Sequence, residues 1–411
     1  MNFRLHRHVR KGALSALAVL GLFGPAAASA MTLPSIDLNA YCAQTYGSAA
    51  YATLTQSNAF GWTCRLNGSN YPMDLNAACR QQHTNGDSAD YLNYSDPYSW
   101  YCVLRTTYSS MNGSSLSEYV WRGTKVALMT ANRTCPTATV MKLVDAMDSG
   151  YTFYRTATNQ DPQAWTPTTY QGRDVLAALP TGTLSACGSN FSACGYIGSN
   201  GVEFRDTTFT TICDATRLND QYDQTPFYEL GRNFWFYGDK LEYKGTDNTG
   251  SITTGYAVAM RFLAMDYASV SAKGAPISGT SFSTMRSAVQ GLVDTYRNNS
   301  SLNWSNTLKT GTAPTNSYNL KGTDLFASFV LRLHRVHGSA FINQLWRKAA
   351  ARPNATTTQD AVDNFVIAAS QAANANLYGL FTTTWRWTVS SSAQSYLQST
   401  LGNPVSATPY L

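Results

Sequence analysis

The chain has little charge and, beyond its first 30 residues, no long apolar run. Charged residues make up 13% of the 411 residues. After residue 30 there is no run of Lys and Arg of the kind that forms a nucleic-acid-binding face. No segment there is apolar over the roughly 20 residues that a membrane helix needs. We therefore expect neither a nucleic-acid partner nor a membrane span.

Several catalytic signatures are also missing. The sequence has no G-x-S-x-G elbow, no P-loop and no dinucleotide fingerprint. After residue 30 the histidines are His83, His334 and His337. The last two are three residues apart on an expected helix and could hold a metal weakly, but exposed positions on a basic helix surface explain them more simply. We expect no cofactor.

The first 30 residues have the pattern of a cleavable secretory signal. Basic residues precede an apolar run over 13–23, and Ala28-Ser29-Ala30 is a small-residue cleavage site. Four of the 30 Lys and Arg residues lie there and no acidic residue does, so the remainder has 26 basic against 24 acidic residues. We expect a protein that starts near Met31, is secreted or periplasmic, and is nearly neutral.

Eight cysteines in an exported chain predict four disulfides. The stretch 37–42, DLNAYC, is echoed by DLNAAC at 74–79, and GWTC at 61–64 by SWYC at 99–102. This repeat predicts two small disulfide-clipped units, Cys42–Cys64 and Cys79–Cys102. Proximity then predicts Cys187–Cys194, and elimination leaves Cys135–Cys213.

We expect two domains and an α+β fold. The repeats form a module over 31–108, the Ser/Gly/Asn-rich segment 109–117 reads as a linker, and 118–411 is long enough for one domain with a full core. In that domain strand character precedes helical periodicity, which favours α+β. The expected strand is 119–129, turns and strands follow over 195–209, and helices are expected over 137–147, 225–243, 254–267, 282–297, 322–351 and 358–374.

One helix carries the motif YELGR, Tyr228 to Arg232. It is followed by TGYA at 254–257, DLFASF at 324–329 and GSAF at 338–341. The order and spacing of these four pieces, over about 190–345, resemble zincin-like secreted metallopeptidases of the gluzincin type, including enhancin-like peptidases and plant basic secretory proteins. The resemblance implies a zincin-like domain with HExxH on a helix and a third zinc ligand on the next.

All three metal-ligand positions depart from that pattern. Tyr228, Arg232 and Thr254 stand where the resemblance implies His, His and Glu. A catalytic zinc needs three N, S or carboxylate ligands, and Arg stays protonated. We therefore expect no metal site and no ordinary zinc peptidase chemistry.

The retained Glu229 allows two interpretations. Arg232 could take the place of the metal and neutralise Glu229, which is structural. Alternatively Glu229 is a general base or nucleophile, with Tyr228 and Arg232 holding substrate. Glycoside hydrolysis then needs a second carboxylate. The candidates near the motif are Asp223, Asp239 and Glu242, with Asp266 and Asp324 further along the chain.

Aromatic residues around the motif are also open to two interpretations. Trp235 and Tyr256 could stack on sugars, or they could belong to the core. The leading hypothesis is a monomeric, zinc-independent hydrolase acting on an extracellular polysaccharide or cell-wall glycan. The alternative is a non-catalytic protein with a zincin-like scaffold that binds such a glycan.

Overall fold

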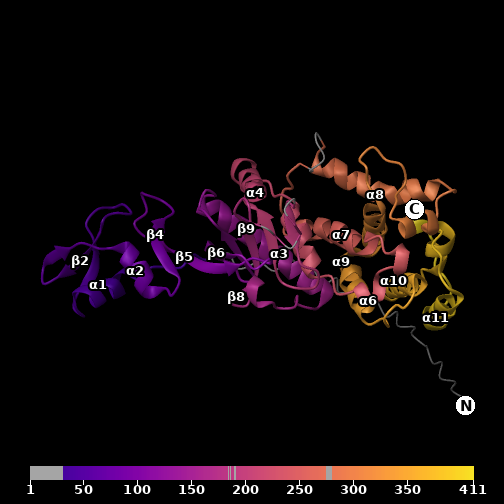
Figure 1. Ribbon diagram of the computed structural model, residues 1–411, viewed down its shortest axis with the longest axis horizontal. Helices are drawn as coiled ribbons and strands as arrows, with labels where there is room; N and C mark the ends of the chain where they lie inside the picture. Colours follow the sequence, from indigo (N-terminus) through magenta and orange to yellow (C-terminus); the bar gives the residue numbers. More distant parts are fainter. Residues whose placement is uncertain (1–30, 184, 186, 189–190, 275–279) are drawn as a thin grey trace, which may run out of the picture.

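A computed structural model describes residues 31–411, apart from 184, 186, 189–190 and 275–279. The molecule is elongated, with the cysteine repeats at one end and a helical body at the other (Figure 1). A mixed sheet and surrounding helices confirm the α+β class. None of the helices in the described part of the chain combines the length and hydropathy of a membrane span.

All four predicted disulfides are present, and no cysteine is free among the described residues. They are Cys42–Cys64, Cys79–Cys102, Cys135–Cys213 and Cys187–Cys194. Such a set is typical of an oxidising compartment and indicates an extracellular protein.

The two repeats fold in the same local way. Asp37 caps the first helix, α1, and Asp74 caps the second, α2, each by accepting the N–H three residues later at 2.9 Å. The first copy continues into a small three-stranded sheet of its own, whereas the strands of the second copy join the main sheet. The elements are α1 (Leu38–Tyr46), β1 (Tyr51–Leu54), β2 (Trp62–Leu66), β3 (Ser69–Tyr71), α2 (Leu75–Gln82), β4 (Gly86–Tyr91) and β5 (Trp100–Ser109).

The main sheet runs from the second repeat into the body in the order β10-β11-β9-β7-β6-β5-β4, with β8 paired to β9. Strand β9 is parallel to β7 and β11, and the other pairs along this order are antiparallel. The strands not yet given are β6 (Ser115–Arg122), β7 (Val126–Thr130), β8 (Thr169–Tyr170), β9 (Arg173–Leu179), β10 (Ala193–Gly195) and β11 (Val202–Arg205).

The segment 109–117, predicted as a linker, forms a turn between two paired strands of the main sheet. Strand β5 pairs with β4 through its first half and with β6 through its second half, down to Ser109 opposite Ser115. The residues between them form a hairpin turn in which Ser110 N–H donates to Ser114 O at 2.8 Å. Ser, Gly and Asn suit tight turns as well as flexible linkers, so composition alone does not separate the two.

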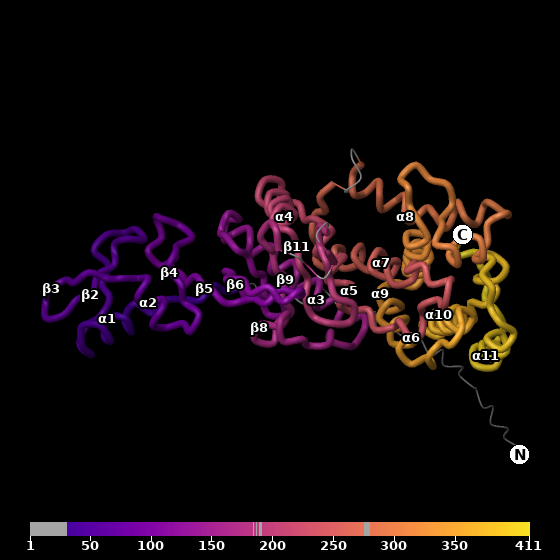
Figure 2. Tube along the Cα trace, viewed as in Figure 1, coloured from indigo at the N-terminus to yellow at the C-terminus, as the bar shows by residue number. Residues whose placement is uncertain are grey.

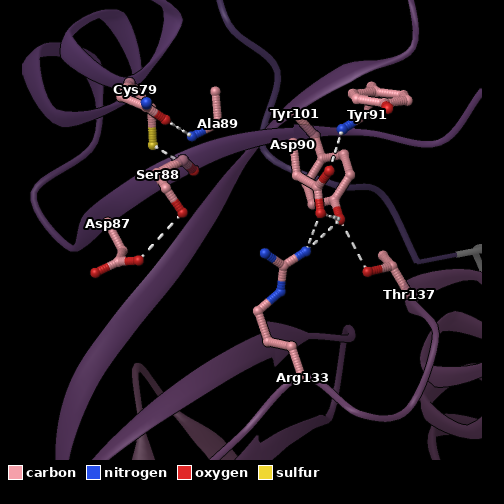
Figure 3. A network of polar contacts seen from close by, with 10 residues as sticks. Cys79, Asp87, Ser88, Ala89, Asp90, Tyr91, Tyr101, Arg133 and Thr137 are labelled. Carbon is pink, nitrogen blue, oxygen red and sulfur yellow. Dashed lines mark hydrogen bonds and ion pairs between the residues drawn. The ribbon is translucent and has the colours of Figure 1, made fainter. Parts of the chain in front are cut away.

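Polar contacts also tie the second repeat to the body (Figure 3). Arg133, after β7, forms an ion pair with Asp90 on β4 and donates to the Tyr101 hydroxyl at 3.0 Å. The same hydroxyl lies 2.8 Å from Oγ1 of Thr137, the first residue of α3. The repeat module is therefore held to the body through both backbone pairing and side chains.

Helices pack against one face of the sheet and continue as a bundle away from the repeats (Figure 2). Along β7, Val126 and Leu128 belong to the helical core, while Ala127 and Met129 pack in a second cluster on the opposite face. This period-2 alternation with burial on both sides is expected of a central strand. The main helices are α3 (Thr137–Thr158), α4 (Asp206–Asn219), α5 (Thr225–Asn233), α6 (Gly238–Leu241), α7 (Ser251–Tyr267), α8 (Phe282–Asn298), α9 (Gly322–Ala350), α10 (Thr358–Ala373) and α11 (Ser391–Leu401).

Most predicted helices are confirmed within a few residues, but the one over 225–243 is too long. Helix α5 ends at Asn233, and only 238–241 return to helix as α6. The Asn233 amide donates to Tyr196 O at 2.7 Å and Gly201 O at 3.0 Å, which anchors the chain where it leaves the helix. Phe234, Trp235 and Tyr237 are all buried, and leaving the helix lets these closely spaced rings turn inward together.

Candidate functional site

Helix α5 holds the motif beside β10, the strand at the edge of the main sheet. Pro226 stands in the first turn, where its missing N–H costs no helix hydrogen bond. Gly195 on β10 donates its N–H to Glu229 Oε2 at 2.8 Å. A Cβ at Gly195 would lie 2.3 Å from Glu229 O, so only glycine allows this close approach of strand and helix.

Arg232 supplies the second partner of Glu229. Its Nε lies 3.8 Å from Glu229 Oε2, an ion pair beyond hydrogen-bond distance. The Glu229 side chain is 10% exposed and that of Arg232 is 29% exposed. Burial raises the pKa of Glu229, while Arg232 and the Gly195 N–H oppose that rise. Glu229 is thus a mostly buried carboxylate with both a cation and a backbone donor on one oxygen.

A second cation, Arg261 on α7, was not anticipated from the sequence. Its guanidinium lies 5.6 Å from the centre of the Tyr228 ring and donates to Gln224 Oε1. Burial lowers the pKa of Arg261, with Asp324 the largest opposing influence. The signal that could have revealed it is a single charged residue inside the apolar run 255–265. Tyr228 therefore has an arginine from each of two helices nearby, Arg261 on α7 and Arg232 on α5.

The side chains at the three ligand positions do not fit a zinc ion. Burial raises the pKa of the Tyr228 phenol, and a phenol is not among the N, S and carboxylate ligands typical of zinc sites. Arg232 brings a positive charge that is never lost, and Thr254 offers only a hydroxyl. Among the residues that the structure describes, no group of three or more His, Cys, Asp and Glu is placed to hold a metal.

The two predicted partner carboxylates have other surroundings. Asp223 precedes α5, accepts Thr225 N–H at 2.8 Å, and lies 3.3 Å from Lys273 Nζ. Asp239 is exposed on α6, where its backbone carbonyl accepts Ala355 N–H at 2.7 Å. Neither is joined to Glu229 by a hydrogen bond or shared partner in the described part of the chain.

The other candidate carboxylates, Asp324, Asp266 and Glu242, also form structural contacts. Asp324 caps α9 by accepting Lys321 N–H at 2.9 Å, and Asp266 forms a bidentate pair with Arg286. Glu242 accepts from the indole N–H of Trp235 at 3.2 Å and from the Thr253 hydroxyl. Among the described residues, none of these acids shares a hydrogen bond or ion pair with Glu229.

Trp235 and Tyr256 are core residues, which corrects their assignment as substrate contacts. Tyr256 is 0% exposed and Trp235 is 2% exposed. The Tyr256 ring packs against Trp346 with 4.7 Å between centroids, and its hydroxyl donates to Phe234 O at 3.2 Å. Rings without accessible surface cannot stack on a ligand.

The two helical histidines are likewise part of the packing. His337 lies 2.7 Å from the Tyr410 hydroxyl through Nε2. Burial lowers the pKa of both His334 and His337. They are half-buried and not exposed as expected.

Neither the protein-family models nor the curated proteins contain a match to the chain. Among solved structures, it is similar to a functionally unknown conserved protein from Bacillus anthracis, at 12% identity and a TM-score of 0.46 over 72% of this chain and 54% of that one. A metallopeptidase in complex with Tn antigen matches at 11% identity and a TM-score of 0.44, over 87% and 68% of the two chains.

The M60 catalytic domain of Clostridium perfringens ZmpC, in complex with the sialyl T antigen, matches at 15% identity and a TM-score of 0.42 over 72% of this chain and 51% of that one. The chain thus spans about half the length of the first and third of these structures. It is distantly similar in structure to M60-like zincin metallopeptidases, at a level that assigns no function.

Proposed function

We propose that this chain is a non-catalytic, extracellular glycan-binding protein, built around a zincin-like helix that has exchanged its metal ligands for an ion pair. The observation that carries the proposal is that the Glu229 carboxylate is nearly enclosed by its neighbours. Its Oε2 is shared by Gly195 N–H and Arg232, and little of its side chain reaches solvent. A carboxylate held in this way is poorly placed to accept a proton from substrate or water.

The contacts of the two candidate partner acids support binding over hydrolysis. A glycosidase needs two carboxyl groups facing the bond to be cleaved, about 5–10 Å apart. Asp223 is paired with Lys273, and Asp239 is exposed on α6.

A glycan suits the surface of the chain better than a charged polymer. Only 13% of the residues are charged. The exposed large hydrophobic side chains include several tyrosines and Phe60, most of them in the repeat module. Rings and uncharged hydrogen-bonding groups together match the mixed apolar and hydroxylated faces of sugars.

The decisive experiment pairs binding with turnover. Purified wild-type protein and Glu229→Gln are applied to a glycan array and incubated with the same glycans and a peptide library, with and without a strong chelator. We expect both proteins to bind the same glycans equally, to release no product, and to be unaffected by the chelator.

Product release that disappears in Glu229→Gln would overturn the proposal in favour of the hydrolase. Activity lost only in the chelator, together with one zinc per chain by elemental analysis, would overturn the account of the replaced ligands.

A further inference from the structure

The two repeats present exposed aromatic rings at equivalent positions. Phe60 in the first copy corresponds to Tyr98 in the second, since each lies two residues before the repeated tryptophan. Phe60 is 60% exposed and Tyr98 is 76% exposed. Exposed apolar rings at the same position of both copies indicate an interaction site, because contiguous exposed apolar surface is uncommon on proteins that bind nothing there.

Each exposed ring is supported by the tryptophan of the other copy. Phe60 packs edge-on against Trp100 and Tyr98 packs edge-on against Trp62, with 5.4 Å between centroids in both pairs. The exchange is reciprocal in the backbone as well: Trp62 Nε1 donates to Pro97 O at 2.7 Å, and Trp100 Nε1 donates to Ala59 O at 2.5 Å. These contacts relate the copies by approximate twofold symmetry and fix the orientation of both rings.

Further rings extend the surface around Phe60. Tyr91 and Tyr94 lie 5.4 and 6.0 Å from it between centroids. A backbone hydrogen bond also joins the two copies here, because Ala59 N–H donates to Tyr94 O at 2.8 Å. The rings therefore form a preorganised surface, which reduces the entropy lost when a ligand binds.

The charge of the surrounding segments identifies the kind of ligand. The segments 51–64 and 91–104 contain one charged residue, Asp96, and its Oδ1 accepts Tyr98 N–H at 2.9 Å. Asn93, Ser95 and Gln56 are exposed beside the rings and offer uncharged hydrogen-bonding groups. An acidic or basic polymer would find no complementary charge here, whereas a neutral, hydroxyl-rich ligand would.

We propose that Phe60 and Tyr98 are twin stacking platforms for a neutral polysaccharide, each taking the apolar face of a sugar ring. This rests on the proposed function and locates its binding surface in the repeat module, away from α5. Two equivalent platforms on one rigid module suit a polymer of repeating units, because the second contact forms at high effective concentration.

The test uses the full chain and three neutral polysaccharides: cellulose, chitin and a β-1,3-glucan, with polygalacturonate as the charged comparison. Depletion isotherms are measured for wild type, Phe60→Ala, Tyr98→Ala and the double variant. Tyr51→Ala is the matched control, an exposed ring of the same module with no ring partner among the described residues. We expect about tenfold weaker binding in each single variant and at least about a hundredfold in the double.

Normal binding by the double variant would overturn the platform while leaving glycan binding elsewhere intact. Loss of binding by Tyr51→Ala to the same extent would also overturn it. If wild type bound none of the neutral polysaccharides, the proposed ligand would be wrong. If wild type sedimented as a dimer and the double variant as a monomer, the rings would form a dimer interface and not a glycan-binding surface. All variants should melt like wild type, because the changed rings are exposed.

A separate observation concerns Met31, the residue after the predicted cleavage site. It is 4% exposed, and its backbone nitrogen donates to Oδ1 of Asp145 on α3 at 2.6 Å. The next residues lie along β5, where Cys102 N–H donates to Pro34 O at 2.8 Å. Burial raises the pKa of Asp145 and the Met31 N–H opposes that rise.

We infer that processing after Ala30 makes Met31 an α-ammonium that pairs with Asp145 and fastens the following residues to α3. The inference rests on the predicted cleavage site. An ammonium carries more positive charge than an amide N–H, so the new end would strengthen the contact that is already present.

Exported protein is compared with the same protein after selective N-terminal acetylation, each with and without Asp145→Asn. Intact mass should place the N-terminus at Met31. Acetylation should lower Tm by several degrees when Asp145 is present and by none when it is replaced. An N-terminus elsewhere, or the same loss of Tm in both backgrounds, would overturn the inference.

Discussion

Aromatic side chains are used in opposite ways at the two ends of the molecule. Around α5 they are enclosed: Tyr256, Tyr237 and Trp346 have no exposed surface and pack against one another. In the repeat module Phe60 and Tyr98 stand in solvent, and the tryptophans beneath them are held by backbone carbonyls. The residue types are alike, so their roles follow from what surrounds them.

The difference reflects how each region is stabilised. The body buries its apolar residues in one large core cluster, although it also contains Cys135–Cys213 and Cys187–Cys194. The module has one small cluster of its own, around Cys42–Cys64, and Cys79–Cys102 joins the cluster on the second face of the main sheet, so the module does not need to bury every ring. Rings that are not required for stability are free to contact a ligand.

The largest expected effect is at Tyr256. Removing this buried ring in Tyr256→Ala should destabilise the protein by about 3–5 kcal/mol through lost burial and a cavity. Tyr98→Ala in the module should change the free energy of unfolding by less than about 0.5 kcal/mol. Chemical denaturation measures both. Similar effects at the two sites would break the comparison, and a near-wild-type Tyr256→Ala would restore Tyr256 as a candidate ligand contact.

The next effect is expected from the module disulfide. Replacing Cys42 and Cys64 together by Ser should cost about 3 kcal/mol, because the closed loop of 22 residues gains freedom in the unfolded state. The loss should be confined to the module, seen as early proteolysis within 31–75 while the helical signal in circular dichroism melts as before. Joint melting of both regions at the lower temperature would show that the module is not locally stabilised.

Glu118 on β6, near the junction of the two regions, should make stability depend on pH. It is fully buried, neither carboxylate oxygen has a partner among the described residues, and burial raises its pKa to about 8, partly opposed by Arg105. The folded protein therefore holds this proton more tightly than the unfolded chain. Its contribution is present below the unfolded pKa, near 4.5, and is lost as pH rises through about 8.

Glu118→Gln should remove that dependence. Relative to wild type, the variant should gain about 2–3 kcal/mol between pH 6 and pH 8, at roughly 1.4 kcal/mol for each pKa unit. Denaturation at a series of pH values, with exposed Asp239→Asn as control, measures the gain. Parallel curves for Glu118→Gln and wild type would show that the carboxyl is neutral or solvated throughout.

The smallest effect is expected at the ion pair of α5. Arg232→Ala should cost about 1–3 kcal/mol, since Glu229 would keep a buried charge with only Gly195 N–H as partner. Arg232→Leu combined with Glu229→Gln should recover most of this, because the amide oxygen can still accept that N–H. A double-mutant cycle by thermal melting tests it. An Arg232→Ala variant with wild-type Tm would mean that Arg232 does not compensate Glu229.

The sequence by itself determined features in which local pattern and covalent chemistry suffice. The spacing of the repeats predicted both module disulfides, and the even cysteine count then constrained the rest. The period of apolar residues located α7, α8 and α10 to within a few residues, because a helix buries one face at a fixed period. Tyr228 and Arg232 also predict, from donor chemistry, that zinc has no suitable ligands there, and this stays a prediction.

Only the tertiary structure decided which side chains meet. Gly195 and Arg261 are far from Glu229 and Tyr228 in sequence, and no local pattern couples them. The end of α5 at Asn233 depends on an amide reaching the loop at 196–201, which local helix propensity does not contain. Burial of Tyr256 and exposure of Tyr98 likewise depend on neighbours brought from distant segments, since a ring's own chemistry is the same in a core and on a surface.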